Sequence, residues 1–122
     1  MPRLSNYYFG TAILFLIAGI MLGLHMSMTQ NYTSTGAHAH INLLGWVTMS
    51  LFGIYLALNP AKAAWGLARI QYYVYVLGVL VLTCSLYLML NGYQQMEPVV
   101  AISSLVAFLG VLLFAVIIFR RA

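Results

Sequence analysis

Three histidines are the residues of this chain best suited to chemistry beyond spanning a lipid layer. His25 stands alone, whereas His38 and His40 are separated by a single residue. Imidazole nitrogens are good ligands for haem iron, copper and zinc. The chain has one cysteine, Cys84, in an apolar run, so a disulfide or a cysteine-based zinc site within one chain is excluded. The histidines are therefore the candidate metal or cofactor ligands.

The spacing of His38 and His40 decides how the pair can work. At 3.6 residues per turn, two helical residues that are two positions apart point about 200° away from each other. They cannot chelate one ion as a pair four residues apart would. We expect them to face two neighbours, which suits planar cofactors on either side of the helix, or ligand sets completed by other helices or subunits.

A stripe of small and polar residues follows His38 at helical spacing. Its members are Asn42, Gly45, Met49 and Gly53. Asn42 offers a hydrogen bond, and the glycines leave room for a flat ring or for a closely packed helix. The stripe fits both a cofactor slot and a helix-packing surface.

Composition places these residues in a membrane protein. Of 122 residues, 64% are hydrophobic and 5% are charged, whereas soluble domains carry about 25% charged residues. A membrane helix needs roughly 20 apolar residues, and four segments qualify: 6–28, 38–58, 69–90 and 98–119. Because the links are short, neighbouring helices must run antiparallel. The sequence predicts an all-α membrane protein, with residues 1–122 forming one up-down-up-down domain of four helices.

The basic residues predict the orientation of this domain. They flank the N-terminus, the second link and the C-terminus, which share one side of the membrane: Arg3, Lys62, Arg69, Arg120 and Arg121. The first and third links have no Lys or Arg. The positive-inside rule then places both termini in the cytoplasm, so the three histidines lie at the outer face. Basic residues at membrane ends are expected to act as anchors and topology signals, and none forms a patch for nucleic acid.

The stretch 36–46, Gly-Ala-His-Ala-His-Ile-Asn-Leu-Leu-Gly-Trp, resembles histidine-bearing helices of the haem-copper oxidase superfamily. The superfamily includes the large subunit of nitric-oxide reductases and related NnrS-type membrane proteins. There, a second helix starts at the outer face with a histidine that ligates a low-spin haem, and a later helix carries a His-x-His pair for two haems. The resemblance implies a non-covalent haem b on His40 and His38, with Asn42 and Gly45 beside it.

The resemblance also implies an assembly. The family subunit has twelve core helices in three arcs of four, so a homotrimer of this chain would supply the same number. In such a trimer, His38 of one subunit and His40 of its neighbour could ligate one haem from opposite sides. The resemblance further implies a multi-pass protein of the bacterial inner membrane.

Departures from the family pattern limit the expected chemistry. The family's copper site needs a further cluster of three histidines, and its proton pathway needs several carboxylates. This chain has no histidine outside the three above, and Glu97 is its only acid. One protomer therefore lacks a complete catalytic site, and we expect electron transfer or binding of a diatomic gas (O2 or NO) rather than an enzymatic reaction.

Two other interpretations fit the same residues. One is a copper- or metal-handling membrane protein that uses the histidines with nearby methionines: His25, Met26, Met28, His38 and His40. The other is a cofactor-free accessory subunit of a respiratory complex, whose histidines only satisfy the membrane interface. His25 has no counterpart in the resemblance, so its role as a ligand, a neighbour of the site or a bystander stays open.

Overall fold

The computed structural model describes residues 1–121, and these form helices joined by short links. The membrane-length helices are α1 (Arg3–Thr29), a composite second helix, α5 (Gly66–Leu90) and α6 (Glu97–Phe119). The composite helix consists of α2 (Thr35–His40), the π-helical η1 (Ile41–Val47) and α3 (Thr48–Leu58). The links hold α4 (Pro60–Ala63) and the short 3-10 turn η2 (Gln94–Met96).

The prediction of four apolar helices in a multi-pass membrane protein is confirmed. The helices Arg3–Thr29, Thr35–Leu58, Gly66–Leu90 and Gln94–Phe119 are each long and apolar enough to cross a bilayer. Each begins slightly before its predicted start. Polar residues such as Arg3 and Thr35 fit a first helical turn but add nothing to an apolar pattern, so hydropathy places the starts too late.

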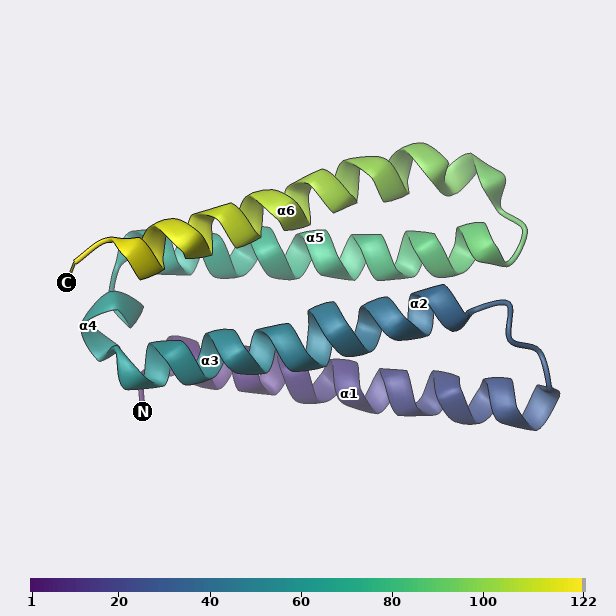
Figure 1. Ribbon diagram of the computed structural model, residues 1–122, viewed down its shortest axis with the longest axis horizontal. Helices are drawn as coiled ribbons and strands as arrows, with labels where there is room; N and C mark the ends of the chain where they lie inside the picture. Colours follow the sequence, from purple (N-terminus) through teal and green to yellow (C-terminus); the bar gives the residue numbers. More distant parts are fainter. Residues whose placement is uncertain (122) are drawn as a thin grey trace.

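The helices form two antiparallel hairpins that lie side by side (Figure 1). One hairpin pairs α1 with the composite second helix, and the other pairs α5 with α6. Both chain ends and α4 lie at one end of the bundle, which we call the terminal end. The loop after α1 and the α5–α6 turn lie at the opposite end, which we call the histidine end because His38 and His40 lie there, at the start of the second helix.

Glycines let the helices of the first hairpin approach closely. A methyl group built at Gly45 would lie 2.5 Å from Cδ1 of Phe15, and one at Gly53 would lie 2.8 Å from Cε1 of Phe9. Two phenylalanines of α1 thus fill the space that the glycines of the second helix leave. Such contacts matter in a membrane, because an apolar side chain gains little free energy when it leaves lipid to contact another helix.

Glycines also let the two helices of the second hairpin approach closely. Here the glycines face backbone and Cβ atoms of the neighbouring helix rather than phenylalanine rings. A methyl group at Gly78 in α5 would lie 2.7 Å from the backbone nitrogen of Ala107 in α6. Gly110 in α6 would meet Cβ of Tyr75 at 2.7 Å. The two helices therefore touch almost backbone to backbone at their midpoints.

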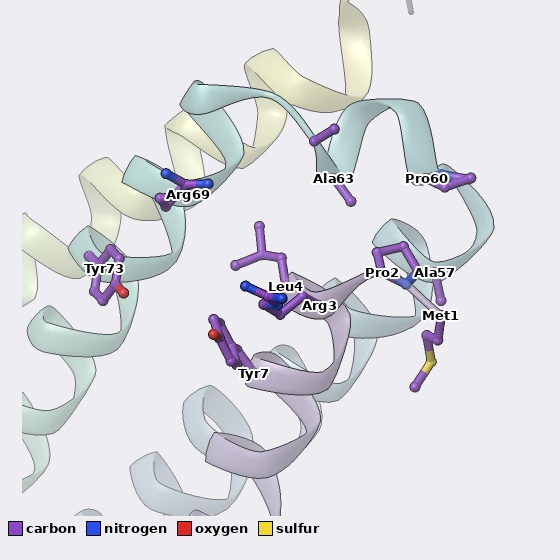
Figure 2. A pocket seen from close by; sticks show the side chains of 11 residues that line it. Met1, Pro2, Arg3, Leu4, Tyr7, Ala57, Pro60, Ala63, Arg69 and Tyr73 are labelled. Carbon is purple, nitrogen blue, oxygen red and sulfur yellow. The ribbon is translucent and has the colours of Figure 1, made fainter.

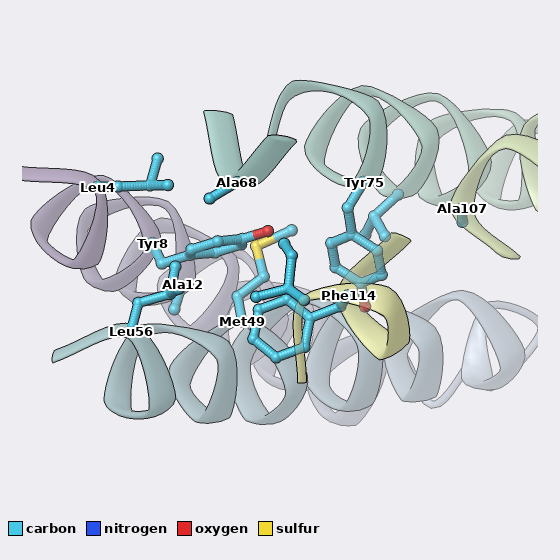
Figure 3. Packing of buried hydrophobic residues seen from close by; sticks show 11 residues of the cluster. Leu4, Tyr8, Ala12, Met49, Leu56, Ala68, Tyr75, Ala107 and Phe114 are labelled. Carbon is cyan, nitrogen blue, oxygen red and sulfur yellow. The ribbon is translucent and has the colours of Figure 1, made fainter. Parts of the chain in front are cut away.

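A buried polar connection joins the two hairpins. The hydroxyl of Tyr8 in α1 donates to Oε1 of Gln71 in α5, and Nε2 of Gln71 donates to the carbonyl of Gly110 in α6 at 3.0 Å. Neither side chain is exposed. Around it pack apolar and aromatic side chains, among them Met49 and Phe114 (Figure 3). The connection ties three of the four membrane helices into one bundle.

Lys62, one of the basic residues expected at the membrane ends, is buried within the bundle. Its side chain is only 7% exposed. The ammonium donates to the hydroxyl of Tyr55 at 2.8 Å and to the carbonyl of Ile118 at 3.0 Å. Ile118 lies in the last turn of α6, where a positive charge satisfies free carbonyls and complements the helix dipole. The charge therefore serves packing between α4 and the end of α6.

We predict that Gly78→Ala destabilises the bundle by about 1–3 kcal/mol, because its methyl group must push two backbones apart. Gly10→Ala is the matched control, since nothing lies within 4 Å of a methyl group there. Thermal or SDS unfolding of both variants in detergent checks this. Equal stability of the two variants would contradict the close α5–α6 contact.

Candidate functional site

The three histidines lie at the histidine end but do not form one cluster. His25 is exposed near the end of α1, while His38 and His40 lie in the short helix α2. Among residues 1–121, no group of three His, Cys, Asp or Glu side chains is placed to hold a metal ion. Each histidine must therefore be judged by its own surroundings.

His40 has one nitrogen fixed and the other free of any hydrogen bond within the described chain. Its Nδ1 lies 2.8 Å from the carbonyl oxygen of Gly36, one turn earlier in the same helix. A carbonyl oxygen only accepts, so in the neutral ring Nδ1 carries the proton and Nε2 carries the lone pair. A backbone carbonyl on one ring nitrogen is the usual way in which proteins orient a histidine whose other nitrogen binds a metal.

His38 is engaged inside the chain. Its Nε2 lies 3.2 Å from Nδ2 of Asn42 in the following turn. Its ring packs on α1, where a methyl group at Gly23 would lie 3.0 Å from the ring carbon Cε1. Nδ1 of His38 is buried and has no hydrogen-bond partner. Such an atom costs about 1–3 kcal/mol, so His38 is packed but not fully satisfied.

Asn42 and His38 pack against two glycines of α1, Gly19 and Gly23. A methyl group at Gly19 would overlap Oδ1 of Asn42. Gly19 and Gly23 are four residues apart, as are His38 and Asn42, so two polar side chains lie against a small-residue face. Together with the Gly45–Phe15 contact, this assigns the stripe of the second helix a packing role within one chain. Asn42 contacts His38 as a neighbour in the site.

A π-helix, which the sequence pattern does not predict, begins directly after His40. In Ile41–Val47 the backbone makes hydrogen bonds five residues apart. The amide of Thr48 bonds the carbonyl of Leu43, and the hydroxyl of Thr48 donates to the same oxygen at 2.7 Å. The one sequence signal for this π-helix is Thr48, three residues after Gly45, because a threonine hydroxyl can bond a backbone carbonyl of its own helix.

Tyr75 donates a hydrogen bond to a backbone carbonyl of the π-helix. Because the amide of Thr48 bonds Leu43, the carbonyl of Leu44 loses its usual α-helical partner, and the hydroxyl of Tyr75 donates to it at 2.8 Å. Tyr75 is fully buried, whereas Tyr73 is 55% exposed. Tyr75 thus packs inside the bundle, whereas Tyr73 lies on its surface. Tyr75 connects α5 to the helix that carries His38 and His40.

The two methionines near His25 lie in different surroundings. His25 and Met28 are exposed, but Met26 is buried, 6% exposed, against the bundle. The three histidines of the copper interpretation form no common cluster within residues 1–121. The hydroxyl of Thr29 donates to the backbone carbonyl of His25 at 2.9 Å, and the imidazole of His25 makes no hydrogen bond within the described residues.

No protein-family model, curated protein or solved structure matches this chain. The resemblance to the haem-copper oxidase superfamily therefore rests on the sequence of residues 36–46 alone.

The imidazole of His40 fits an axial haem ligand. It is oriented by the Gly36 carbonyl, is only partly buried, and presents an unengaged Nε2. His38 fits this role less directly, since the amide of Asn42 occupies its Nε2. The two histidines make separate contacts, which agrees with their expected opposite directions on an α-helix.

We predict that Tyr75→Phe destabilises the bundle by about 1 kcal/mol and speeds hydrogen exchange in residues 44–49, because the Leu44 carbonyl loses its partner. Tyr73→Phe makes the same chemical change on an exposed residue of the same helix and should change neither. Hydrogen–deuterium exchange by mass spectrometry in detergent measures both. Unchanged exchange in Tyr75→Phe would show that the π-helix does not depend on this bond.

Proposed function

We propose that the protein binds haem b through His40 and is a small relative of the haem-copper oxidase core in the bacterial inner membrane. The observation that carries the proposal is the Nδ1 contact of His40 with the Gly36 carbonyl, which leaves Nε2 as an oriented, unengaged ligand. In this proposal both termini are cytoplasmic, and the histidine end faces the periplasm.

A haem at this position would supply electron transfer if two histidines ligate it, and binding of O2 or NO if His40 is its single protein ligand. The chain itself contributes orientation. Gly36 fixes the tautomer of His40, and Tyr75 holds the backbone of the adjacent π-helix. π-helical turns occur frequently at functional sites, and this one begins at the residue that follows His40.

The second axial ligand in this proposal is His38 of a neighbouring subunit in a homotrimer. The unsatisfied Nδ1 of His38 supports a change in its surroundings on assembly. In the trimer, Nε2 of His38 would release the amide of Asn42 and bind the haem iron instead. A trimer of four-helix chains would have the twelve helices of the superfamily core.

A cofactor-free accessory subunit is the second candidate, and one observation favours it. His38 and Asn42 pack into the glycines of α1, as residues would that only hold two helices together. Copper binding has no comparable support within one chain, and it enters the experiment below as an outcome.

The absorption spectrum of protein purified from a membrane fraction with adequate haem supply tests the proposal. We expect a Soret band and sharp α-bands after reduction, because two imidazole ligands give a low-spin b-type haem. A colourless protein without iron contradicts the proposal. Metal analysis then separates the alternatives: bound copper supports the metal-handling protein, and a metal-free preparation supports the accessory subunit.

We predict that His40→Ala removes the haem bands or strongly alters them, because the oriented ligand is lost. His25→Ala is the matched control and should leave the spectrum unchanged, since His25 is exposed on another helix. If His25→Ala alters the bands and His40→Ala does not, the ligand lies on α1 and the assignment to His40 is wrong.

The mass of the haem-loaded protein in detergent tests the assembly. We expect a trimer by native mass spectrometry or light scattering, and His38→Ala should weaken the trimer and change the ligation of the haem together. A haem-loaded monomer would contradict ligation between subunits.

A further inference from the structure

A pocket with a basic rim lies at the terminal end, far from the histidines. It has a volume of about 710 Å³ and opens between the start of α1 and the start of α5. Figure 2 shows Arg3 and Tyr7 from α1 and Arg69 and Tyr73 from α5 around the same space. Ligand pockets in proteins commonly have volumes of about 300–1,000 Å³.

The two helices present the same pair of residues to this pocket. On each helix an arginine precedes a tyrosine by four residues, which places both on one face. Both helices start at the terminal end, so each tyrosine lies about 6 Å deeper along the helix than its arginine. The pocket is thus charged at its mouth and aromatic one turn below, and Leu4 and Ala63 add apolar lining.

Nothing in the described chain neutralises these arginines. Arg3 and Arg69 are exposed and make no side-chain hydrogen bond or ion pair within residues 1–121. The only acid, Glu97, begins α6 at the histidine end. Neither α1 nor α5 has an acidic residue in its first turn, so the positive ends of two helix dipoles add to the same charge.

The order of charged, aromatic and apolar residues from the mouth of the pocket inward indicates which kind of anion it binds. A helix that spans the bilayer begins at the level of the lipid headgroups, and basic pockets between membrane helices bind anionic headgroups. Arginine matches a phosphate through two parallel N–H donors, and tyrosine rings prefer the layer just below the surface. A phosphorylated solute would match the charge but would leave the apolar lining unfilled.

We propose that this pocket is a binding site for one anionic phospholipid. Its phosphate lies between Arg3 and Arg69, its glycerol region lies beside Tyr7 and Tyr73, and its acyl chains lie along α1 and α5. The inference needs only that the four helices span a membrane, so it is independent of the haem proposal.

A lipid titration of the full chain in neutral detergent, read by native mass spectrometry, tests the site. The probes are phosphatidylglycerol, phosphatidylcholine and inorganic phosphate. We expect one tightly retained phosphatidylglycerol, and weaker binding of phosphatidylcholine, which has the same phosphate but no net charge. The double variant Arg3→Gln/Arg69→Gln should bind phosphatidylglycerol about 30-fold more weakly, since each basic residue near a lipid headgroup changes affinity about fivefold.

Arg121→Gln is the matched control, because it removes a charge at the same end outside the pocket. It should keep the affinity for phosphatidylglycerol. Both arginines of the pocket are exposed, so the double variant should melt at the same temperature as the parent without lipid. Equal binding by the double variant and the parent overturns the site. Displacement of phosphatidylglycerol by millimolar inorganic phosphate also overturns it, because the pocket would then recognise a free anion rather than a lipid.

Discussion

Lipid satisfies no backbone or side-chain hydrogen bond, and this constraint shapes the whole molecule. Apolar burial gives little preference for one helix neighbour over another in such a solvent. Specific pairing must come from close glycine contacts and from a few buried polar groups. The Tyr8–Gln71–Gly110 connection is the central example, because one amide side chain joins α1, α5 and α6. The Tyr75–Leu44 and Thr11–Tyr72 hydrogen bonds are further polar contacts between the two hairpins.

The same constraint explains which features could be predicted from the sequence. Four apolar stretches of membrane length predict four helices, because only a helix satisfies its own backbone in lipid. The short links then make the helices antiparallel. The burial of Lys62 could not be predicted in this way. It depends on the meeting of α4 with the last turn of α6, and hydropathy carries no information on that contact.

The candidate site was predicted in part. The position of His38 and His40 at one end follows from their place near the start of a helix, and their separate contacts follow from helical geometry. The π-helix does not follow, since backbone hydrogen bonds shifted by one residue change the register without changing the apolar pattern. Its presence links two regions of the chain: the hydroxyl of Tyr75 in α5 holds the carbonyl that this shift releases. The surroundings of His40 therefore depend on both hairpins.

The buried ammonium of Lys62 gives the folded protein an unusual chemical property. Lys62 is the only lysine of the chain, and two oxygen acceptors and two aromatic rings surround its charge. The amine nitrogen of a lysine must reach an acylating reagent to react, and burial of the Lys62 side chain keeps such reagents away. Side-chain acylation would therefore begin when α4 separates from the end of α6. Acylation of this one native lysine would thus report the opening of the terminal end of the bundle, without any introduced label.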